Sequence, residues 1–171
     1  MDELTTKLVP LGDATLSRLR GDVIVPTYDR ARLTPGIVHI GLGNFHRGHQ
    51  TWYLHRLMQD GLAHDWAIIG AGVRSYDTAM RQRLAAQDYL TTLIELDPDQ
   101  SGAEVVGSMI GYVPIEDGNG PLIAQMADPA IRIVSLTGTE GGYFRDAAAG
   151  GFDAGHEDIV HDIANPATPR T

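Results

Sequence analysis

The chain has 171 residues, 43% hydrophobic and 20% charged, a balance typical of a folded domain rather than a disordered chain. Thirteen basic against 22 acidic residues leave a formal net charge of −9 and no basic stripe, so no nucleic-acid partner is expected. The absence of cysteine excludes a disulfide framework, an iron–sulfur cluster and a thiolate zinc site. The acidic N-terminus and the short apolar runs predict no signal peptide, no membrane partner and a cytoplasmic location.

A polar lead-in occupies residues 1–34. In it we expect a short helix that starts at an Asp13 cap, and we expect Pro26 to keep the apolar residues before it out of a central strand. The pattern assigns no chemistry to this segment.

Strand and helix patterns alternate after the lead-in. A short β-branched run at 37–40 is typical of a buried parallel strand, and apolar residues at helical spacing over 45–60 predict a helix that Gly61 ends. A second buried strand is expected at 66–73, followed by a helix that ends at about Gln87.

The rest of the chain adds a hairpin and one more strand. Segments 89–96 and 105–113 have strand character and flank a turn-rich stretch, which favours an antiparallel hairpin. A short helix is predicted at 121–127, a buried strand at 131–136 and a short helical segment within 156–171.

This order of elements predicts an α/β fold. We expect a Rossmann-like, mostly parallel sheet with helices on both faces and an antiparallel hairpin insertion. The predicted organisation is an N-terminal lead-in at 1–34 and a partial dinucleotide-binding domain at 35–171. The sheet is expected to keep an unpaired edge, so the chain is interpreted as a fragment of a larger protein.

Two glycines stand where the first parallel strand gives way to the helix. In such a Gly-x-Gly turn, Gly41 makes the tight turn and Gly43 lets a pyrophosphate approach the backbone, while the helix N-terminus attracts the phosphates. His46 replaces the third glycine of the dinucleotide fingerprint, so an ordinary glycine turn remains an alternative.

An acidic residue follows the second parallel strand, as a ribose-binding carboxylate should. Asp77 lies 34 residues after Gly43, later than the usual spacing, so a plain helix cap is the alternative. A carboxylate there accepts both ribose hydroxyls and repels a 2′-phosphate, which predicts NAD in preference to NADP.

Histidines on the first helix raise the question of a metal. His46 and His49 share a helix face, but no cysteine and no matching carboxylate accompany them, so no metal site is expected. Arg47, in the first helical turn, is a candidate phosphate contact or a solvated side chain.

Residues 36–50 read GIVHIGLGNFHRGHQ, which resembles the fingerprint of the polyol-specific long-chain dehydrogenases of the mannitol dehydrogenase type. Further segments resemble the family in family order: 26–30, 86–89, 132–137, 139–143 and 161–166. The resemblance covers the chain from about residue 23 to its end.

The resemblance implies a coenzyme site. It places Gly41, Gly43, Asn44, Phe45 and His46 at the NAD pyrophosphate, Asp77 at the adenosine ribose, and Thr137 with Glu140 near the nicotinamide. Three residues depart from the family pattern: Gly48 in place of alanine, Gly138 in place of a bulky apolar residue, and Phe144 in place of a smaller one.

The family's chemistry is metal-free hydride transfer between NAD and a secondary alcohol. Its general base is a lysine in a Lys-x4-Asn-x2-His motif of a helical C-terminal domain, and this chain has one lysine, Lys7, and no such motif. We therefore expect no catalytic base here, with Glu140 as a possible accessory group, and coenzyme binding without turnover.

Several functions remain open. The first is an NAD-dependent polyol dehydrogenase that interconverts mannitol and fructose, with a fructuronate-type hexuronate reductase as an alternative substrate class. The second is a non-catalytic NAD-binding module. A methyltransferase ranks last, because Val38, His39 and Ile40 precede the glycines where that class has an acidic residue. The expected partners are a small polyol or sugar and the family's C-terminal domain.

Overall fold

The structure of the protein is a computed structural model that describes residues 8–19, 21–97, 101–138, 143–146, 148 and 150–170. The chain divides into two units, Met1–Leu136 and Thr137–Thr171, which are described separately below.

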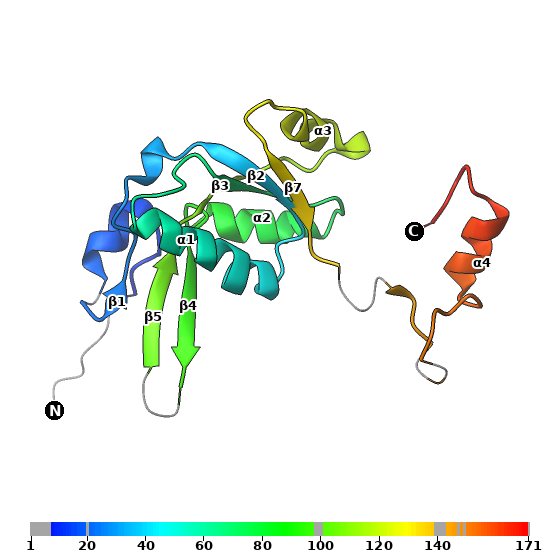
Figure 1. The fold of residues 1–171 in the computed structure, drawn as a ribbon, viewed down its shortest axis with the longest axis horizontal. Coiled ribbons are helices and arrows are strands. Elements are labelled where there is room, and N and C mark those ends of the chain that lie inside the picture. Colours follow the sequence, from blue (N-terminus) through cyan, green and yellow to red (C-terminus); the bar gives the residue numbers. More distant parts are fainter. Residues whose placement is uncertain are drawn as a thin grey trace. The chain divides into compact units, whose positions relative to one another are not determined.

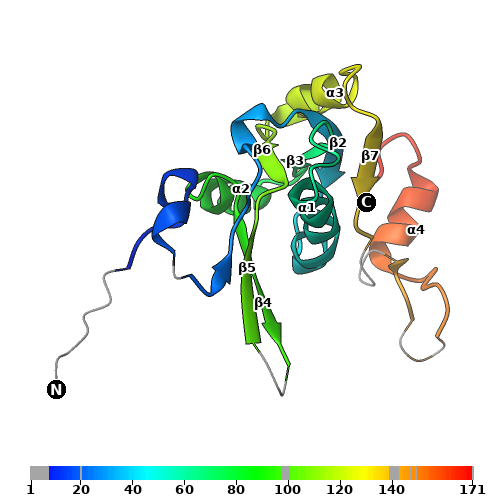
Figure 2. The ribbon, with the colours of Figure 1, turned by 60° about the vertical axis from the view of Figure 1, so that its left-hand side comes forward.

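A four-stranded sheet forms the centre of the first unit, in the order β6-β3-β2-β7 (Figures 1 and 2). Its strands are β2 (Pro35–Ile40), β3 (Ala67–Ala71), β6 (Met109–Tyr112) and β7 (Ile133–Leu136). All neighbouring pairs are parallel, as the short apolar runs predict.

Helices cover both faces of this sheet, which confirms the predicted α/β class. On one face, apolar side chains of α1 (Thr51–Gln59) and α2 (Asp77–Ala85) pack against Ile37 and Ile68 of the sheet. On the other face, α3 (Gly120–Met126) places Leu122 against Val38. In the described part of the chain, no helix is long and apolar enough to cross a lipid bilayer.

A second sheet has the order β1-β5-β4. Strands β4 (Thr91–Leu96) and β5 (Ser101–Val106) form the predicted antiparallel hairpin, which extends away from the four-stranded sheet (Figures 1 and 2). Strand β1 (Val23–Ile24) pairs with β5 at the sheet edge, as expected for residues that Pro26 follows.

The predicted single strand at 105–113 is wrong. The chain leaves the hairpin at Gly107 and Ser108 and enters the parallel sheet as β6. Ser108 is fully buried there, and its hydroxyl donates to the Thr51 carbonyl at 2.7 Å. An apolar run alone does not show that its two halves belong to different sheets.

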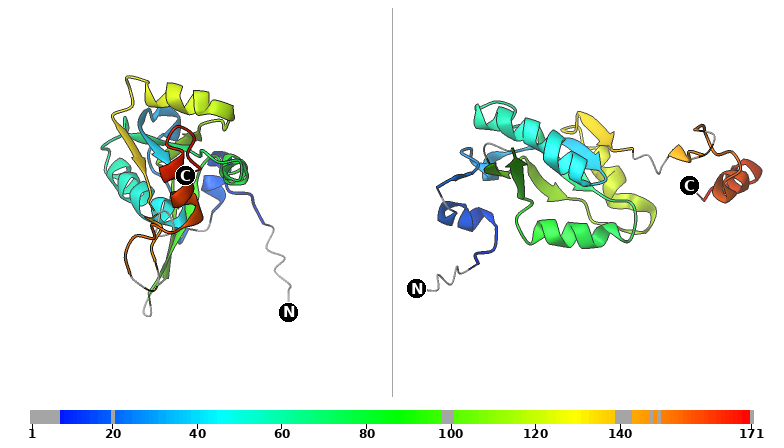
Figure 3. Two further views of the ribbon diagram at one scale, coloured as in Figure 1. Left: turned by 90° about the vertical axis from the view of Figure 1, so that its right-hand side faces the viewer. Right: turned by 90° about the horizontal axis from the view of Figure 1, so that it is seen from below.

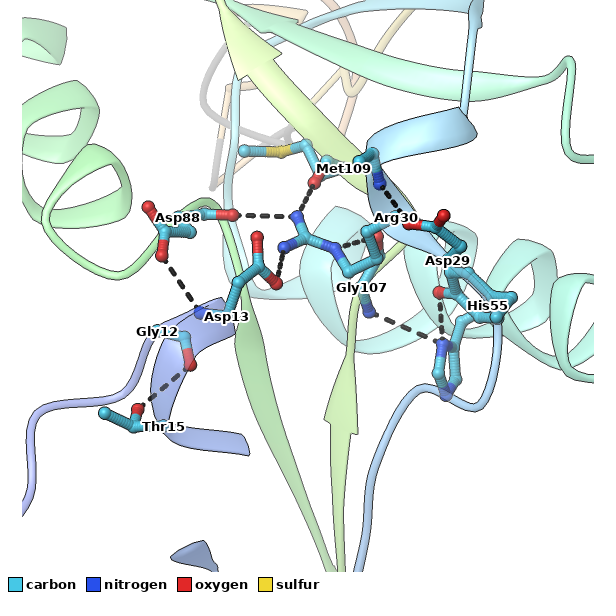
Figure 4. Close-up of polar contacts among 11 residues, drawn as sticks. Gly12, Asp13, Thr15, Asp29, Arg30, His55, Asp88, Gly107 and Met109 are labelled. Carbon is cyan, nitrogen blue, oxygen red and sulfur yellow. Dashed lines mark hydrogen bonds and ion pairs between the residues drawn. The ribbon is translucent and has the colours of Figure 1, made fainter. Parts of the chain in front are cut away.

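The lead-in is anchored to this crossover. Arg30, the first residue of the 3₁₀ turn Arg30–Arg32, donates to the carbonyls of Gly107 at 2.9 Å and of Asp88 and Met109 at 2.8 Å (Figure 4). Its guanidinium also pairs with Asp13. Asp13 is therefore not the predicted cap, because its side chain turns to Arg30 and the 3₁₀ helix Asp13–Arg18 has no side-chain cap.

A second buried contact ties the lead-in to α1 and β5. The Tyr28 hydroxyl lies 2.7 Å from His55 Nδ1, and His55 Nε2 lies 3.2 Å from the buried carboxylate of Glu104. Trp52 donates to the same carboxylate at 2.6 Å. Burial lowers the pKa of His55 and raises the pKa of Tyr28, so both groups are neutral near pH 7.

The strand predicted at 131–136 is present as β7, but the prediction that it is buried is wrong. Ile133, Val134 and Leu136 are all exposed, Leu136 at 68%. β7 pairs on one side with β2 and ends the sheet order on the other. The apolar sequence of β7 is typical of a buried strand, but the elements of the first unit leave its apolar side chains exposed.

The second unit contains α4 (Glu157–Ala164), the red helix of Figure 3, as the short helical segment near the end of the chain predicts. His156 caps it by accepting from the Asp158 amide at 3.3 Å. The Phe144 ring packs edge-on against His156, with ring centroids 4.7 Å apart. The larger side chain at position 144 thus supports the helix start.

Candidate functional site: the glycine turn at the end of β2

The turn between β2 and the first helix contains two glycines that are bordered by open space. Gly41 has φ +90°, a conformation that favours glycine, and its amide donates to the Ala71 carbonyl of β3 at 2.9 Å. An added Cβ at Gly41 or Gly43 would meet no heavy atom within 4 Å. The predicted succession of strand, glycine turn and helix is therefore present, with open space beside both glycines.

The helix after the turn begins with one π-helical turn, His46–Gln50, which continues into α1. The first helical bond runs from the Arg47 amide to the Gly43 carbonyl at 3.2 Å, so the amides of residues 44–46 precede it. The helix ends before Gly61, which has φ +78°, as predicted. A π turn in place of an α turn is not visible in the apolar spacing.

Side chains around the turn divide into an exposed and a buried group. Gly43, Asn44 and Phe45 are exposed, and Asn44 accepts from Arg47 Nη2 at 2.6 Å. The Phe45 ring lies 4.9 Å from the ring of His49. His46, in contrast, is 1% exposed.

The buried His46 ring stacks on another histidine. Its centroid lies 3.7 Å from that of His39 on β2, and the two planes differ by 5°. Burial, and after it the neighbouring His39, lowers the pKa of His46 to about 4. Burial also lowers the pKa of His39. Both imidazoles are therefore neutral near pH 7.

Asp77 is the first residue of α2, but it does not cap that helix: the residue before it, Tyr76, is the N-cap and has no side-chain cap bond. Asp77 Oδ2 accepts from the amides of Val73 and Arg74, both at 3.1 Å. The carboxylate thus holds the loop that follows β3, on the sheet edge where β2 also ends.

Two neighbours of Asp77 were not singled out from the sequence. A Cβ on Gly72 would lie 2.6 Å from Asp77 Oδ2 and 2.6 Å from the Tyr112 hydroxyl, so only glycine leaves room for both groups. Burial raises the pKa of Tyr112 to about 12, and the Asp77 charge adds to the shift. Tyr112 is the last residue of β6, so its approach to Asp77 depends on the strand order.

The residues predicted near a nicotinamide are Thr137 and Glu140. Thr137 follows β7 directly and starts the second unit, whereas Glu140 lies outside the described residues. A Cβ on Gly138 would lie 2.8 Å from the Tyr143 hydroxyl. The absence of a bulky side chain at position 138 therefore makes room for Tyr143.

The two histidines considered as metal ligands, His46 and His49, contact different neighbours. Over the described residues, no group of three or more His, Cys, Asp or Glu side chains is arranged to hold a metal ion. His46 faces His39 in the interior, and His49 packs against the exposed Phe45, so the two histidines do not converge.

Sequence reasoning missed three polar residues that are linked to His46 directly or through one another: His39, Gln50 and Ser135. A signal for two of them was present. His39 and Ser135 each occupy the third position of an otherwise apolar strand, in IVHI and IVSL, and the two strands pair with these residues opposite each other. A polar residue at the same place in two buried-type strands indicates a shared contact.

A parallel sheet with helices on both faces and a glycine turn at the carboxyl end of an inner strand defines a protein of the Rossmann type. The family model for the mannitol dehydrogenase Rossmann domain matches residues 35–170. Mannitol 2-dehydrogenase of Cereibacter sphaeroides is 61% identical over 146 residues, which are 85% of this chain and 30% of that relative. Mannitol 2-dehydrogenase of Aspergillus fumigatus is 45% identical over 152 residues, 87% of this chain and 30% of that relative.

Two solved structures are also similar to this chain. A Pseudomonas fluorescens mannitol 2-dehydrogenase, in ternary complex with NAD and D-mannitol, matches with a TM-score of 0.77 and 46% identity, over 95% of this chain and 33% of that one. A D-sorbitol dehydrogenase in substrate-free form matches with a TM-score of 0.69 and 36% identity, over 95% and 34%. The chain belongs to the mannitol dehydrogenase Rossmann domain family. It spans about a third of the length of these relatives.

Proposed function

We propose that the chain is the coenzyme-binding portion of an NAD-dependent polyol dehydrogenase, with residues 1–34 as a lead-in and residues 35–171 as a partial NAD-binding domain. The observation that supports this most is the open space beside Gly41 and Gly43 at the carboxyl end of β2. Ligands of open α/β sheets bind at this edge, where a helix N-terminus attracts phosphate. The relative in complex with NAD and D-mannitol supports the identity of the coenzyme and the substrate class.

Within this proposal, each part of NAD has its own residues. The pyrophosphate lies at the turn and the adenosine ribose at Asp77, whose carboxylate accepts from the ribose hydroxyls. The nicotinamide lies near Thr137 and Glu140. The turn residues are Gly41, Gly43, Asn44, Phe45, His46 and Arg47. Because the His46 ring is buried, it serves the turn through its main chain and its packing.

The proposed reaction is hydride transfer between NAD and a secondary alcohol of a polyol, with mannitol and fructose as the pair. Bound NAD supplies the hydride acceptor, and the family's lysine base takes the hydroxyl proton. That base is not among these 171 residues, whose single lysine, Lys7, lies outside the described part. We therefore expect the chain by itself to bind NADH and to turn over negligibly. The proposed location is the cytoplasm, and the proposed partner is the family's C-terminal domain, which supplies the base.

The glycine turn allows a direct test by NADH titration, followed by nucleotide fluorescence. Gly43→Ala adds a methyl group to space that no protein atom occupies, so the fold remains and NADH binding weakens about tenfold or more, because a good phosphate contact is lost. Gly102→Ala, in the exposed part of the hairpin, adds the same group to equally open space and serves as the matched control.

The two variants separate the outcomes. We expect unchanged NADH affinity for Gly102→Ala and unchanged circular dichroism for both. Equal NADH affinity for wild type and Gly43→Ala, or no binding by the wild-type chain, contradicts the proposed function.

A further inference from the structure

Four buried or half-buried polar side chains close a ring beneath the glycine turn. His39 Nδ1 lies 2.9 Å from the Ser135 hydroxyl, and His46 Nδ1 lies 2.8 Å from Gln50 Oε1. Gln50 Nε2 points to the Ser135 hydroxyl at 3.5 Å, and the stacked rings of His39 and His46 complete the circuit. We call these four residues the polar ring.

Two members of the polar ring, His46 and Gln50, lie at the ends of the π turn. A π turn has more residues per turn than an α turn, so side chains four apart, such as His46 and Gln50, lie nearly above one another. Both therefore face the sheet, where His39 of β2 and Ser135 of β7 stand opposite each other in register. π turns inside helices are frequent at functional sites.

The hydrogen bonds define the protonation of His46. Because Gln50 Oε1 only accepts, His46 Nδ1 carries the proton, and the neutral ring then has a bare lone pair at Nε2. Within the described residues, His46 Nε2 is buried without a hydrogen-bond partner. The His46 ring thus offers no donor to a phosphate, and its observed contacts are with the polar ring.

The polar ring joins two elements that serve different parts of the proposed coenzyme. His39 and His46 flank the glycine turn, where the pyrophosphate is proposed to bind. Ser135 lies two residues before Thr137, on the strand that leads to the proposed nicotinamide residues. β7 is an exposed edge strand, so contacts to β2 and to the helix decide where its end lies.

We propose that the polar ring of His39, Ser135, Gln50 and His46 is a positioning device that holds the glycine turn and the end of β7 in one register for NAD. The inference rests on the proposed function and deepens it. None of the four side chains needs to touch the coenzyme. A ligand that reaches only the glycine turn and Asp77, such as 5′-AMP, does not need the turn and the end of β7 held in one register, whereas the whole dinucleotide does.

This difference gives a test on the 171-residue chain with two probes, NADH and 5′-AMP. Ser135→Ala removes the hydroxyl that His39 and Gln50 share. We expect NADH binding to weaken about fivefold to tenfold, which is the loss of one net hydrogen bond, while 5′-AMP binding at Asp77 changes less than about twofold. Ser135→Thr keeps the hydroxyl and restores most of the NADH affinity. Ser17→Ala, at an exposed position of the lead-in, is the matched control.

A double-mutant cycle supplies a second, independent readout. Gln50→Met removes the other side of the polar ring at similar volume, and Gln82→Met on the exposed face of α2 is its control. If the four residues act as one unit, the Ser135→Ala, Gln50→Met double variant binds NADH no more weakly than Ser135→Ala alone. Additive losses overturn the inference.

The remaining outcomes are distinct. If Ser135→Ala weakens the binding of NADH and of 5′-AMP equally, the variant has lost structure in general, and the positioning role is overturned. Unchanged NADH affinity of Ser135→Ala also overturns this role. If the wild-type chain binds no NADH, the proposed function fails, and the inference fails with it. If wild type binds NADH but not 5′-AMP, the double-mutant cycle decides alone.

Discussion

Asp77 illustrates how one side chain combines a structural and a proposed binding role. Its Oδ2 atom accepts from two loop amides, and the proposal adds the ribose hydroxyls. A carboxylate has enough lone pairs for both sets, because each of its two oxygens accepts more than one hydrogen bond. The helix-cap alternative is not observed, since Asp77 holds the preceding loop rather than the start of α2.

Asp77→Ala is expected to weaken NADH binding and to narrow the preference for NADH over NADPH. The loss for NADH is about tenfold or more, because charged hydrogen bonds contribute roughly 1.5–3 kcal/mol each. Asp77→Asn removes the charge, keeps one oxygen as an acceptor for the two amides and turns the other acceptor into an NH2 donor, so it tests the repulsion of the 2′-phosphate with the loop contacts retained. Titrations of both variants with both coenzymes are the measurement. Unchanged curves for Asp77→Ala remove the proposed role.

Arg30 shows what a residue outside the coenzyme site does for the fold. Its side chain is 8% exposed and donates to three carbonyls from the crossover and the turn after α2. Arg30→Met leaves these acceptors without that donor, and we expect the free energy of unfolding to fall by about 3 kcal/mol. Arg32→Met, at an exposed position in the same turn, is the control, with a change within about 0.5 kcal/mol. Urea denaturation measures both. Similar losses for the two variants contradict this role.

Among the elements, the first helix differs most from its sequence pattern. Its apolar spacing predicts the helix and its end correctly, but not the π turn His46–Gln50 at its start. Two residues of the polar ring, His46 and Gln50, lie at the two ends of this turn.

Gly48, inside the π turn, replaces the alanine of the family pattern. Its added Cβ would meet only Leu93 Cδ1, at 4.0 Å, an ordinary contact. Gly48→Ala is therefore expected to raise the free energy of unfolding by about 0.5–1 kcal/mol, because alanine loses less backbone entropy on folding. Thermal unfolding checks this. A lower melting temperature shows instead that the π turn requires glycine.

The strands differ in how far their apolar sequences predict burial. β2 and β7 have similar runs, IVHI and IVSL, yet Val38 of β2 is fully buried and Val134, its partner in register, is 47% exposed. β2 has a strand on each side and helices on both faces, whereas β7 has one neighbouring strand. Position in the sheet decides the burial.

The stability of the whole molecule is expected to fall in acid, because the buried imidazoles are neutral in the folded state. The unfolded chain protonates His46 at its ordinary value of 6.5, and the folded chain at about 4. Between these values the unfolded state binds more protons, so stability falls as the pH drops from 6.5 towards 4. Arg47 and His39 act in the same direction, since each lowers the pKa of His46.

We expect His46 to account for about 2 kcal/mol of lost stability between pH 7 and pH 5. His46→Asn does not titrate in this range, so its unfolding free energy should depend less on pH, although its stability at pH 7 is lower. Urea denaturation at both pH values measures the two slopes. An equal slope for wild type and His46→Asn contradicts the buried neutral state.

The sequence alone determined the alternation of strands and helices, the parallel sheet, the hairpin, the glycine turn and the place of Asp77 after β3. These features depend on the period of apolar residues and on the backbone freedom of glycine, which are properties of short segments. The tertiary structure decided the crossover at 107–108, the exposure of β7, the approach of Tyr112 and Asp77 to Gly72, and the stacking of His39 on His46. These depend on which segments lie side by side, because burial and hydrogen-bond partners come from residues far apart in the chain.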